Sequence, residues 1–158
     1  MDNIDLKILE KLQKEPEIAV LTLSRYVGLS KTACWNRLQR LEERGIILRR
    51  LVQMDRVKLG LPVVVFLSIT VGQHTPAWVE QFHQVVDDYP EIVEVHRLTG
   101  EGADYQLKIL SASIEAYDQL QQALISKIKF TSMATRIALS EIKSTPHLPL
   151  GHLSRDSE

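Results

Sequence analysis

The sequence predicts an α+β chain made of two parts, and three observations carry this prediction. Apolar residues recur at helical spacing over residues 4–45, whereas stretches with strand and helix patterns alternate after residue 63. Gly60 and Pro62 mark a break between the two patterns. The charge divides at the same place, because residues 1–58 carry 12 Lys and Arg against 8 Asp and Glu, and residues 59–158 carry 7 against 12. A basic half suits contact with phosphates, and an acidic half does not.

The first part has the pattern of three helices and a tight turn. Apolar residues at positions 4, 8, 9 and 12 line one face of an opening helix, which Pro16 ends. Gly28 stands where a second helix must stop in a backbone conformation of positive φ. The hydroxyl of Ser30 can cap a third helix, which Gly45 ends. Helices in this order form a helix-turn-helix, whose last helix enters the major groove of DNA.

One face of the third helix is apolar and the other is polar. Projection at about 100° per residue places Cys34, Leu38 and Leu41 on one stripe, which we expect to face the core. Hydroxyl, amide and guanidinium groups on the opposite face can read base edges. Basic side chains nearby can contact phosphates. The candidate DNA-binding residues are Ser30, Lys31, Thr32, Asn36, Arg37, Gln39, Arg40, Arg44 and Arg49.

Three side chains of this helix have competing interpretations. Arg37 can equally pair with a carboxylate on a neighbouring helix. Trp35 lies at the border of the apolar stripe, and we expect it to be partly buried by packing rather than stacked on a base. Redox sensing by Cys34 would need an exposed thiol of lowered pKa. Its place on the apolar stripe favours packing instead.

The segment after the third helix is rich in residues that favour strands. Residues 46–54 are interpreted as a wing-like strand and connector, and residues 55–62 as a boundary. The sequence therefore predicts a winged helix-turn-helix DNA-binding domain and a second domain joined by a linker. The expected bounds are 1–50 for the first domain, 51–62 for the strand or linker, 63–150 for the second domain and 151–158 for a flexible tail.

The second domain alternates strands and helices. The expected strands are Val63–Val71, Ile92–Leu98, Asp104–Leu110 and Met133–Ile142, and the expected helices are Pro76–Tyr89 and a segment from Ser113 to Ile128. The order strand-helix-strand-strand-helix-strand is the ferredoxin-like βαββαβ plan. Two helices leave one face of a four-stranded sheet uncovered. A second copy of the chain is the simplest partner for that face.

Short motifs along the whole chain occur together in one protein family. They are Ile4–Leu9, Val27–Ser30, Arg37–Glu42, Thr99–Glu101 followed by Asp104 and Tyr105, Ser140–Lys143, and Leu148–Leu150. In these segments the chain resembles the Lrp/AsnC (leucine-responsive/asparagine regulatory) family of transcription regulators, over about residues 2–150. The pair Cys34–Trp35 is similar to one in the branch that includes regulators of cysteine detoxification. The resemblance implies a sequence-specific DNA-binding regulator that responds to a small effector, commonly an amino acid.

The resemblance also implies where the effector binds and how the chain assembles. It implies amino-acid sensing by the ferredoxin-like domain, dimers that often assemble to octamers, and effectors near the turn between the two middle strands. Backbone N–H groups of that turn can hold a carboxylate, and Glu101 or Asp104 can accept an ammonium group. Its glycines can equally serve only the hairpin. The candidate effector-binding residues are Thr99, Gly100, Glu101, Gly102, Asp104 and Thr135.

Two other function classes stay open. An architectural DNA-binding protein would bind DNA without an effector and with weak sequence preference. Sirohaem decarboxylases have a similar fold, but they resemble a pattern with Tyr-Asn-Leu after the hairpin, where this chain has Tyr105, Gln106 and Leu107. Because no paired carboxylates, nucleophile–base pair or phosphate-binding loop stands out elsewhere, we expect no enzyme activity.

Composition narrows the remaining expectations. The chain has one Cys and no apolar run of the ~18–20 residues that a membrane span needs, which favours a cytoplasmic protein. The five His are scattered without ligand spacing, so neither a metal nor a cofactor is expected. The expected partners are double-stranded DNA, further copies of the chain and an amino-acid effector.

Overall fold

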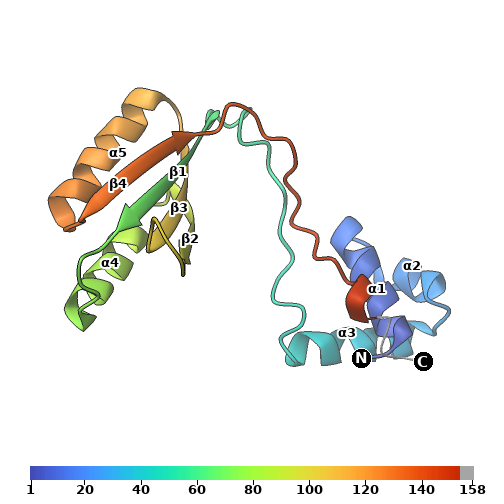
Figure 1. Ribbon diagram of the computed structural model, residues 1–158. Coiled ribbons are helices and arrows are strands. Elements are labelled where there is room, and N and C mark those ends of the chain that lie inside the picture. The colour runs from blue at the N-terminus through green and yellow to red at the C-terminus, as the bar shows by residue number, and fades with distance from the viewer. Residues whose placement is uncertain (154–158) are drawn as a thin grey trace. The chain divides into compact units, whose positions relative to one another are not determined.

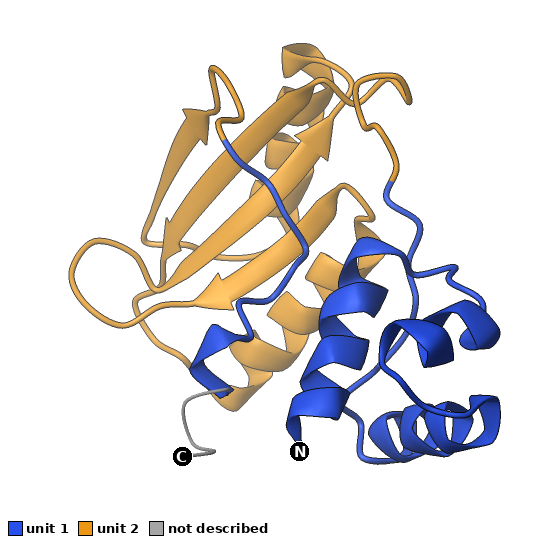
Figure 2. Ribbon diagram, turned by 90° about the vertical axis from the view of Figure 1, so that its right-hand side faces the viewer, with its two compact units in different colours: residues 1–53, 143–158 blue, residues 54–142 orange. Residues whose placement is uncertain are grey.

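The computed structural model describes residues 1–153, which form two compact units. The first unit comprises residues 1–53 and the C-terminal segment from residue 143, and the second unit comprises residues 54–142 (Figure 2). The sequence instead predicted a second domain that continues to residue 150. Of the predicted tail, residues 151–153 form a short 3₁₀ turn, and residues 154–158 lie outside the described part of the chain.

Three helices build the first unit, as the sequence predicted. They are α1 (Asn3–Lys14), α2 (Val20–Tyr26) and α3 (Lys31–Glu43) (Figure 1). The Asp2 carboxylate caps α1 by accepting the N–H groups of Ile4 and Asp5, and the Asp5 carboxylate accepts the N–H of Asp2 in return. The buried core between the helices consists of Ile8, Leu9, Leu12, Leu23, Cys34, Leu38 and Leu41.

The C-terminal segment belongs to this unit because it completes the packing of α1. The side-chain amide of Gln13 donates to the backbone carbonyl of Leu148 at 3.2 Å and accepts the N–H of the same residue. Leu150 packs against the three-helix core. The segment forms no strand and no long helix, so hydrophobic periodicity alone could not assign it to a domain.

The predicted wing-like strand is absent from the described structure. Residues 46–62 form neither helix nor strand, although Ile47 packs against the core of the first unit. A strand needs a hydrogen-bonded neighbour, and no described segment pairs with this one. Leu48, Leu51 and Val52 are 84%, 68% and 78% exposed, so the β-forming residues that suggested a strand lie in an open connector.

The second unit is one antiparallel sheet with two helices. Its elements are β1 (Val63–Thr70), α4 (Pro76–Asp88), β2 (Ile92–Arg97), β3 (Tyr105–Ser111), α5 (Ile114–Lys127) and β4 (Ser132–Ile137). The strand order β2-β3-β1-β4 confirms the ferredoxin-like plan. The last strand ends at Ile137 rather than Ile142, where its pairing with β1 stops.

The two faces of the sheet differ in character. Val65, Leu67 and Ile69 of β1 point into a core that α4 and α5 cover, together with Leu107 and Ile109 of β3. The alternate residues of each strand lie on the face that carries no helix. No helix in residues 1–153 is long and apolar enough to cross a membrane.

Candidate DNA-binding and effector-binding sites

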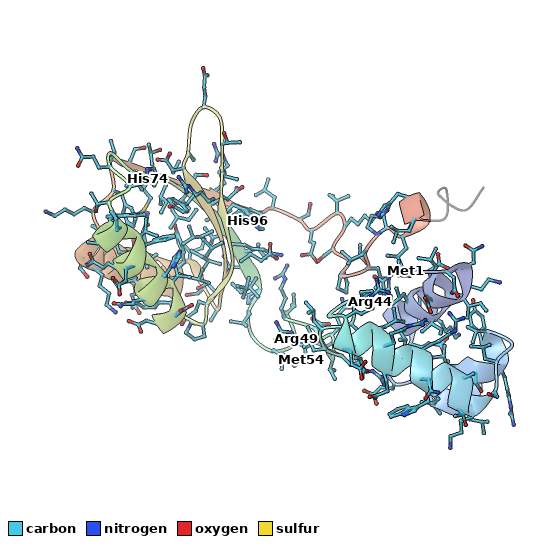
Figure 3. All side chains as sticks on the ribbon, turned by 90° about the horizontal axis from the view of Figure 1, so that it is seen from below. Met1, Arg44, Arg49, Met54, His74 and His96 are labelled. Carbon is cyan, nitrogen blue, oxygen red and sulfur yellow. The ribbon has the colours of Figure 1, made fainter. Side chains whose placement is uncertain are left out.

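Helix α3 presents the polar face that the sequence predicted. Cys34, Leu38 and Leu41 are at most 1% exposed and hold the helix on the core. Most of the candidate DNA-binding residues are exposed, namely Ser30, Lys31, Thr32, Asn36, Arg40, Arg44 and Arg49, whereas Arg37 and Gln39 are partly buried. Arg44 and Arg49 lie where the chain leaves α3 (Figure 3). DNA contact by these residues remains a prediction.

The turn before α3 has the geometry that a helix-turn-helix requires. Gly28 has φ 72°, a conformation in which most side chains are strained. The Leu29 N–H then donates to the Ser24 carbonyl at 2.8 Å and closes the turn. Ser30 Oγ accepts the N–H of Ala33 at 3.2 Å and so caps α3. The predicted stop and cap are therefore both confirmed.

Arg37 joins α3 to two carboxylates of α1. Its Nη1 lies 2.7 Å from Asp2 Oδ2 and 2.7 Å from Asp5 Oδ1. The N–H of Asp5 and then the Arg37 guanidinium lower the pKa of Asp2 from its ordinary value of 3.8. The hydrogen bonds to Asp2 and then Asp5 raise the pKa of Arg37. Of the two interpretations of Arg37, the structure shows the pairing with a neighbouring helix.

The other arginines of this surface keep free donors. Arg40 Nη2 lies 3.6 Å from Asp5 Oδ1, beyond hydrogen-bonding distance, and its side chain is 53% exposed. Arg44 and Arg49 have no carboxylate partner in residues 1–153. Because a guanidinium can bind phosphate or guanine through two parallel hydrogen bonds, these three candidate residues have donors available for DNA.

Cys34 and Trp35 differ sharply in exposure although they are adjacent. Cys34 is 0% exposed, and burial raises the pKa of its thiol, which is opposite to what a redox sensor needs. Trp35 is 49% exposed, so about half of its surface is covered, as the prediction of partial burial requires, and the other half is open to solvent. The Cys34 side of the helix fits into the core, and part of the bulkier indole beside it stays exposed.

The turn between β2 and β3 is anchored on one side and free at its tip. The Thr70 hydroxyl donates to the Gly102 carbonyl at 3.0 Å. Gly100 and Gly102 have φ 115° and 106°. The N–H groups of Thr99, Gly100 and Glu101 donate to no acceptor in the described chain. The positive φ angles that the hairpin requires and the free N–H donors occur in the same turn. The glycines can therefore shape the hairpin and still leave donors for a ligand.

Asp104 fastens the base of this turn to β1. Its N–H donates to the Ile69 carbonyl at 2.9 Å, and its carboxylate accepts the N–H of Val71 at 2.6 Å. His74 Nε2 lies 3.9 Å from the other carboxylate oxygen (Figure 3 labels His74). Of the two acidic residues predicted to bind an effector, Asp104 already accepts a hydrogen bond from the backbone of β1. Glu101 has no partner in residues 1–153.

The structure does not bring Thr135 to the turn within one chain. Thr135 lies on β4 opposite Leu67 of β1, so β1 separates it from β3. Its hydroxyl lies 2.6 Å from the hydroxyl of Tyr117 on α5, and burial raises the pKa of that tyrosine. The prediction groups Thr135 with the residues of the turn, and the strand order contradicts this grouping within one chain.

A hollow of about 390 Å³, which the sequence did not reveal, lies next to the ends of β2 and β3. Its lining comes from α4, β2 and β3 and consists of Phe82, His83, Val86, Asp87, Val95, Arg97 and Tyr105. Arg97 and Tyr105 face each other in the ladder that leads into the turn. Only the apolar spacing of Phe82 and Val86 was visible in the sequence, and that spacing is equally typical of a core helix.

Together the two units define a class of protein. A basic helix-turn-helix with an exposed third helix is a DNA-binding module, and a ferredoxin-like domain with a free turn beside a hollow can receive a small ligand. In residues 1–153 no three His, Cys, Asp or Glu side chains are placed to hold a metal ion. The class is a two-part DNA-binding regulator.

Comparison with known protein families identifies each unit. Residues 1–47 match the winged helix-turn-helix DNA-binding family, and residues 64–148 match the Lrp/AsnC ligand binding domain. The glutamate uptake regulatory protein of Zymomonas mobilis is 38% identical over 158 residues, which are 100% of this chain and 96% of the relative. The DNA-binding transcriptional activator DecR of Escherichia coli is 32% identical over 151 residues, covering 95% and 99%.

Solved structures agree with this assignment. An AsnC family transcriptional regulator from Agrobacterium tumefaciens is 40% identical, with a TM-score of 0.92 over 97% of this chain and 99% of that one. A transcriptional regulator from Neisseria meningitidis in complex with L-methionine is 30% identical, with a TM-score of 0.91 and the same coverage. The chain belongs to the Lrp/AsnC family. It is a DNA-binding transcription regulator with a ligand-binding domain, and not an enzyme.

Proposed function

We propose that an α-amino acid binds at the turn of residues 98–104 and thereby changes the affinity of the protein for DNA. The observation that carries this proposal is the row of free N–H groups at Thr99, Gly100 and Glu101. Such a row favours a carboxylate. The adjacent hollow offers apolar walls for a side chain. The relative from Neisseria meningitidis, which was solved with L-methionine, supports an amino acid as the ligand.

Glu101 is the better acceptor for the ammonium group. Its side chain is exposed and has no partner in residues 1–153. The Asp104 carboxylate instead holds the Val71 N–H at 2.6 Å and fixes the shape of the turn. We therefore assign ligand contact to Glu101 and positioning of the turn to Asp104.

The regulator would act by linkage between ligand binding and assembly. A ligand that binds two assemblies with different affinity shifts the equilibrium between them, and the spacing of paired DNA-binding helices changes with it. We propose that the working form on DNA is a dimer, or an octamer built from dimers, in the cytoplasm, where the DNA of the related bacteria lies. An amino-acid response distinguishes this mechanism from purely architectural DNA binding.

The open face of the sheet supports pairing of two chains. Phe66 lies between the core residues Val65 and Leu67 in β1, so its side chain belongs to the face without helices. Its lateral neighbours are Lys108 and Arg136, whose charges lie on the same face. Phe66 is partly exposed in the single chain, and a second sheet can bury the rest of its ring.

Substitution of Phe66 by aspartate is expected to convert the dimer into a monomer. The charge would be buried without a partner if two sheet faces met there. Light scattering on the full-length protein at micromolar concentration would show the halved mass. Val93→Asp is the matched control, since Val93 is 45% exposed at the bulge of the edge strand and should leave the mass unchanged. A Phe66→Asp variant with the wild-type mass would contradict pairing through this face.

Glu101→Ala is expected to weaken amino-acid binding about tenfold to a hundredfold, because a charged hydrogen bond is lost. A thermal-shift screen of the common amino acids identifies the ligand, since binding raises the melting temperature of the wild type. Titration calorimetry with that amino acid then measures the loss, while DNA binding without ligand should stay near the wild-type level.

Asp104→Asn is the matched control for this experiment. The amide oxygen of asparagine can still accept the Val71 N–H, so the turn should keep its shape and the amino-acid affinity should change by about twofold at most. The reverse result, with a loss only in Asp104→Asn, would transfer the ammonium contact to Asp104. Unchanged affinity in both variants would move the site elsewhere, and a wild type that binds no amino acid would favour the architectural alternative.

A further inference from the structure

We propose that Trp35 is a specificity-determining residue that recognises thymine methyl groups in the major groove. The residue stands in the second turn of α3 and is 49% exposed. It was not among the DNA-binding candidates, because the apolar spacing of the helix assigned it to packing. Its exposure instead makes it the one large apolar side chain that α3 offers to a partner.

The two tryptophans of the chain differ in their contacts. The indole N–H of Trp78 donates to the Lys129 carbonyl at 2.9 Å, and its ring stacks on Phe82 with centroids 5.0 Å apart. Trp35 has no ring contact, hydrogen bond or cation partner in residues 1–153. About half of the indole is exposed, and a large aromatic ring gains from the burial of its exposed part in a complex.

The surroundings of Trp35 favour DNA over an apolar protein surface. Lys31 and Gln39 lie one turn to either side, and Thr32 lies on the adjacent ridge. The first turn of α3 contains no acidic residue, so the positive end of the helix dipole is reinforced by Lys31. A protein partner would have to bury these polar and cationic groups, whereas DNA supplies phosphates and base edges for them.

The chemistry of the indole selects the base. Thymine is the base that presents a methyl group in the major groove, and apolar side chains contact that methyl. Residues near the N-terminus of the recognition helix reach base edges. The indole of Trp35 can therefore cover a thymine methyl while Thr32 and Asn36 form hydrogen bonds to neighbouring bases.

The test removes the indole from the protein and the methyl group from the DNA, separately and together. The full-length wild type first selects its preferred duplex from random sequences, and each thymine is then replaced by uracil, which lacks only the methyl. Replacement of the contacted thymine in one half-site is expected to weaken wild-type binding about fourfold. Trp35→Ala should bind the unmodified duplex about tenfold more weakly and should no longer respond to that uracil.

Two further variants separate recognition from general effects. Trp35→Phe keeps an apolar ring and should keep part of the uracil response. Tyr26→Ala removes an aromatic residue that is 56% exposed on α2 and should keep the full response. Thermal unfolding verifies that each variant is folded. The proposal is overturned if Trp35→Ala retains the uracil response, loses affinity equally for selected and random DNA, or changes the assembly state in light scattering.

Discussion

Replacement of Arg37 by methionine is expected to destabilise the first unit by about 2–4 kcal/mol. Removal of one partner of a buried ion pair typically costs about 3–5 kcal/mol, and partial exposure of Arg37 and Asp2 reduces that figure. The side chain of Asp5 is 3% exposed, so its carboxylate would lose its closest cation inside the protein. Urea unfolding followed by circular dichroism measures the change.

Arg44→Met is the matched control, because Arg44 follows α3, is exposed and has no carboxylate partner in the described chain. That variant should change stability by less than about 0.5 kcal/mol. Adding Asp5→Asn to Arg37→Met should recover part of the loss, since the buried charge is then removed as well. An Arg37→Met protein as stable as the wild type would show that the pairs contribute nothing to folding.

The ion pairs of Arg37 with Asp2 and Asp5 also predict how the stability difference between wild type and Arg37→Met depends on pH. The folded pKa of Asp2 is lowered, so its contribution is present above the ordinary carboxyl value of 3.8 and is lost as the pH falls through the lowered value. The stability gap between wild type and Arg37→Met should therefore be full at neutral pH and should shrink below about pH 4.

Replacement of Arg40 by alanine is expected to weaken binding to the preferred DNA site by about 1–3 kcal/mol, which is roughly fivefold to more than a hundredfold. The Arg40 side chain is 53% exposed, and its Nη2 lies 3.6 Å from Asp5 Oδ1. Its N–H donors are therefore free, while the attraction of the Asp5 carboxylate favours one position of the guanidinium. Fluorescence anisotropy with selected and random duplexes at one salt concentration measures the effect.

The pattern of loss assigns the role of Arg40. A loss confined to the selected duplex indicates base recognition, and an equal loss on both duplexes indicates phosphate contact. Unchanged affinity for both would remove Arg40 from the interface. The free energy of unfolding should be nearly unaffected, because Asp5 forms its shorter ion pair with Arg37 and keeps it in the Arg40→Ala variant.

Elements with a strong local signal could be predicted from the sequence. Gly28 and Ser30 specify the turn and cap through their own backbone and side-chain chemistry. The stripe of Cys34, Leu38 and Leu41 oriented α3 correctly, because burial in a small core follows helical periodicity. The alternation of strands and helices likewise predicted the ferredoxin-like order.

Features that depend on a distant partner could not be predicted. Both Arg37 interpretations were chemically sound, and only the position of α1 decides between them. Residues 46–54 favour strands locally but find no neighbour to pair with. The place of Thr135 depends on the order of strands in the sheet, and the exposure of Trp35 depends on what the rest of the chain leaves uncovered.

The return of residues 143–150 to the first unit has a consequence for biosynthesis. The second unit is continuous in sequence, so all of it is synthesised before those residues. Because domains generally fold as units during synthesis, the ligand-binding domain can form while the DNA-binding helices still lack Leu148 and Leu150. The three helices are thus synthesised before the second unit, but the unit to which they belong is complete only after it. A nascent chain can therefore form its ligand-binding domain before its DNA-binding domain is complete.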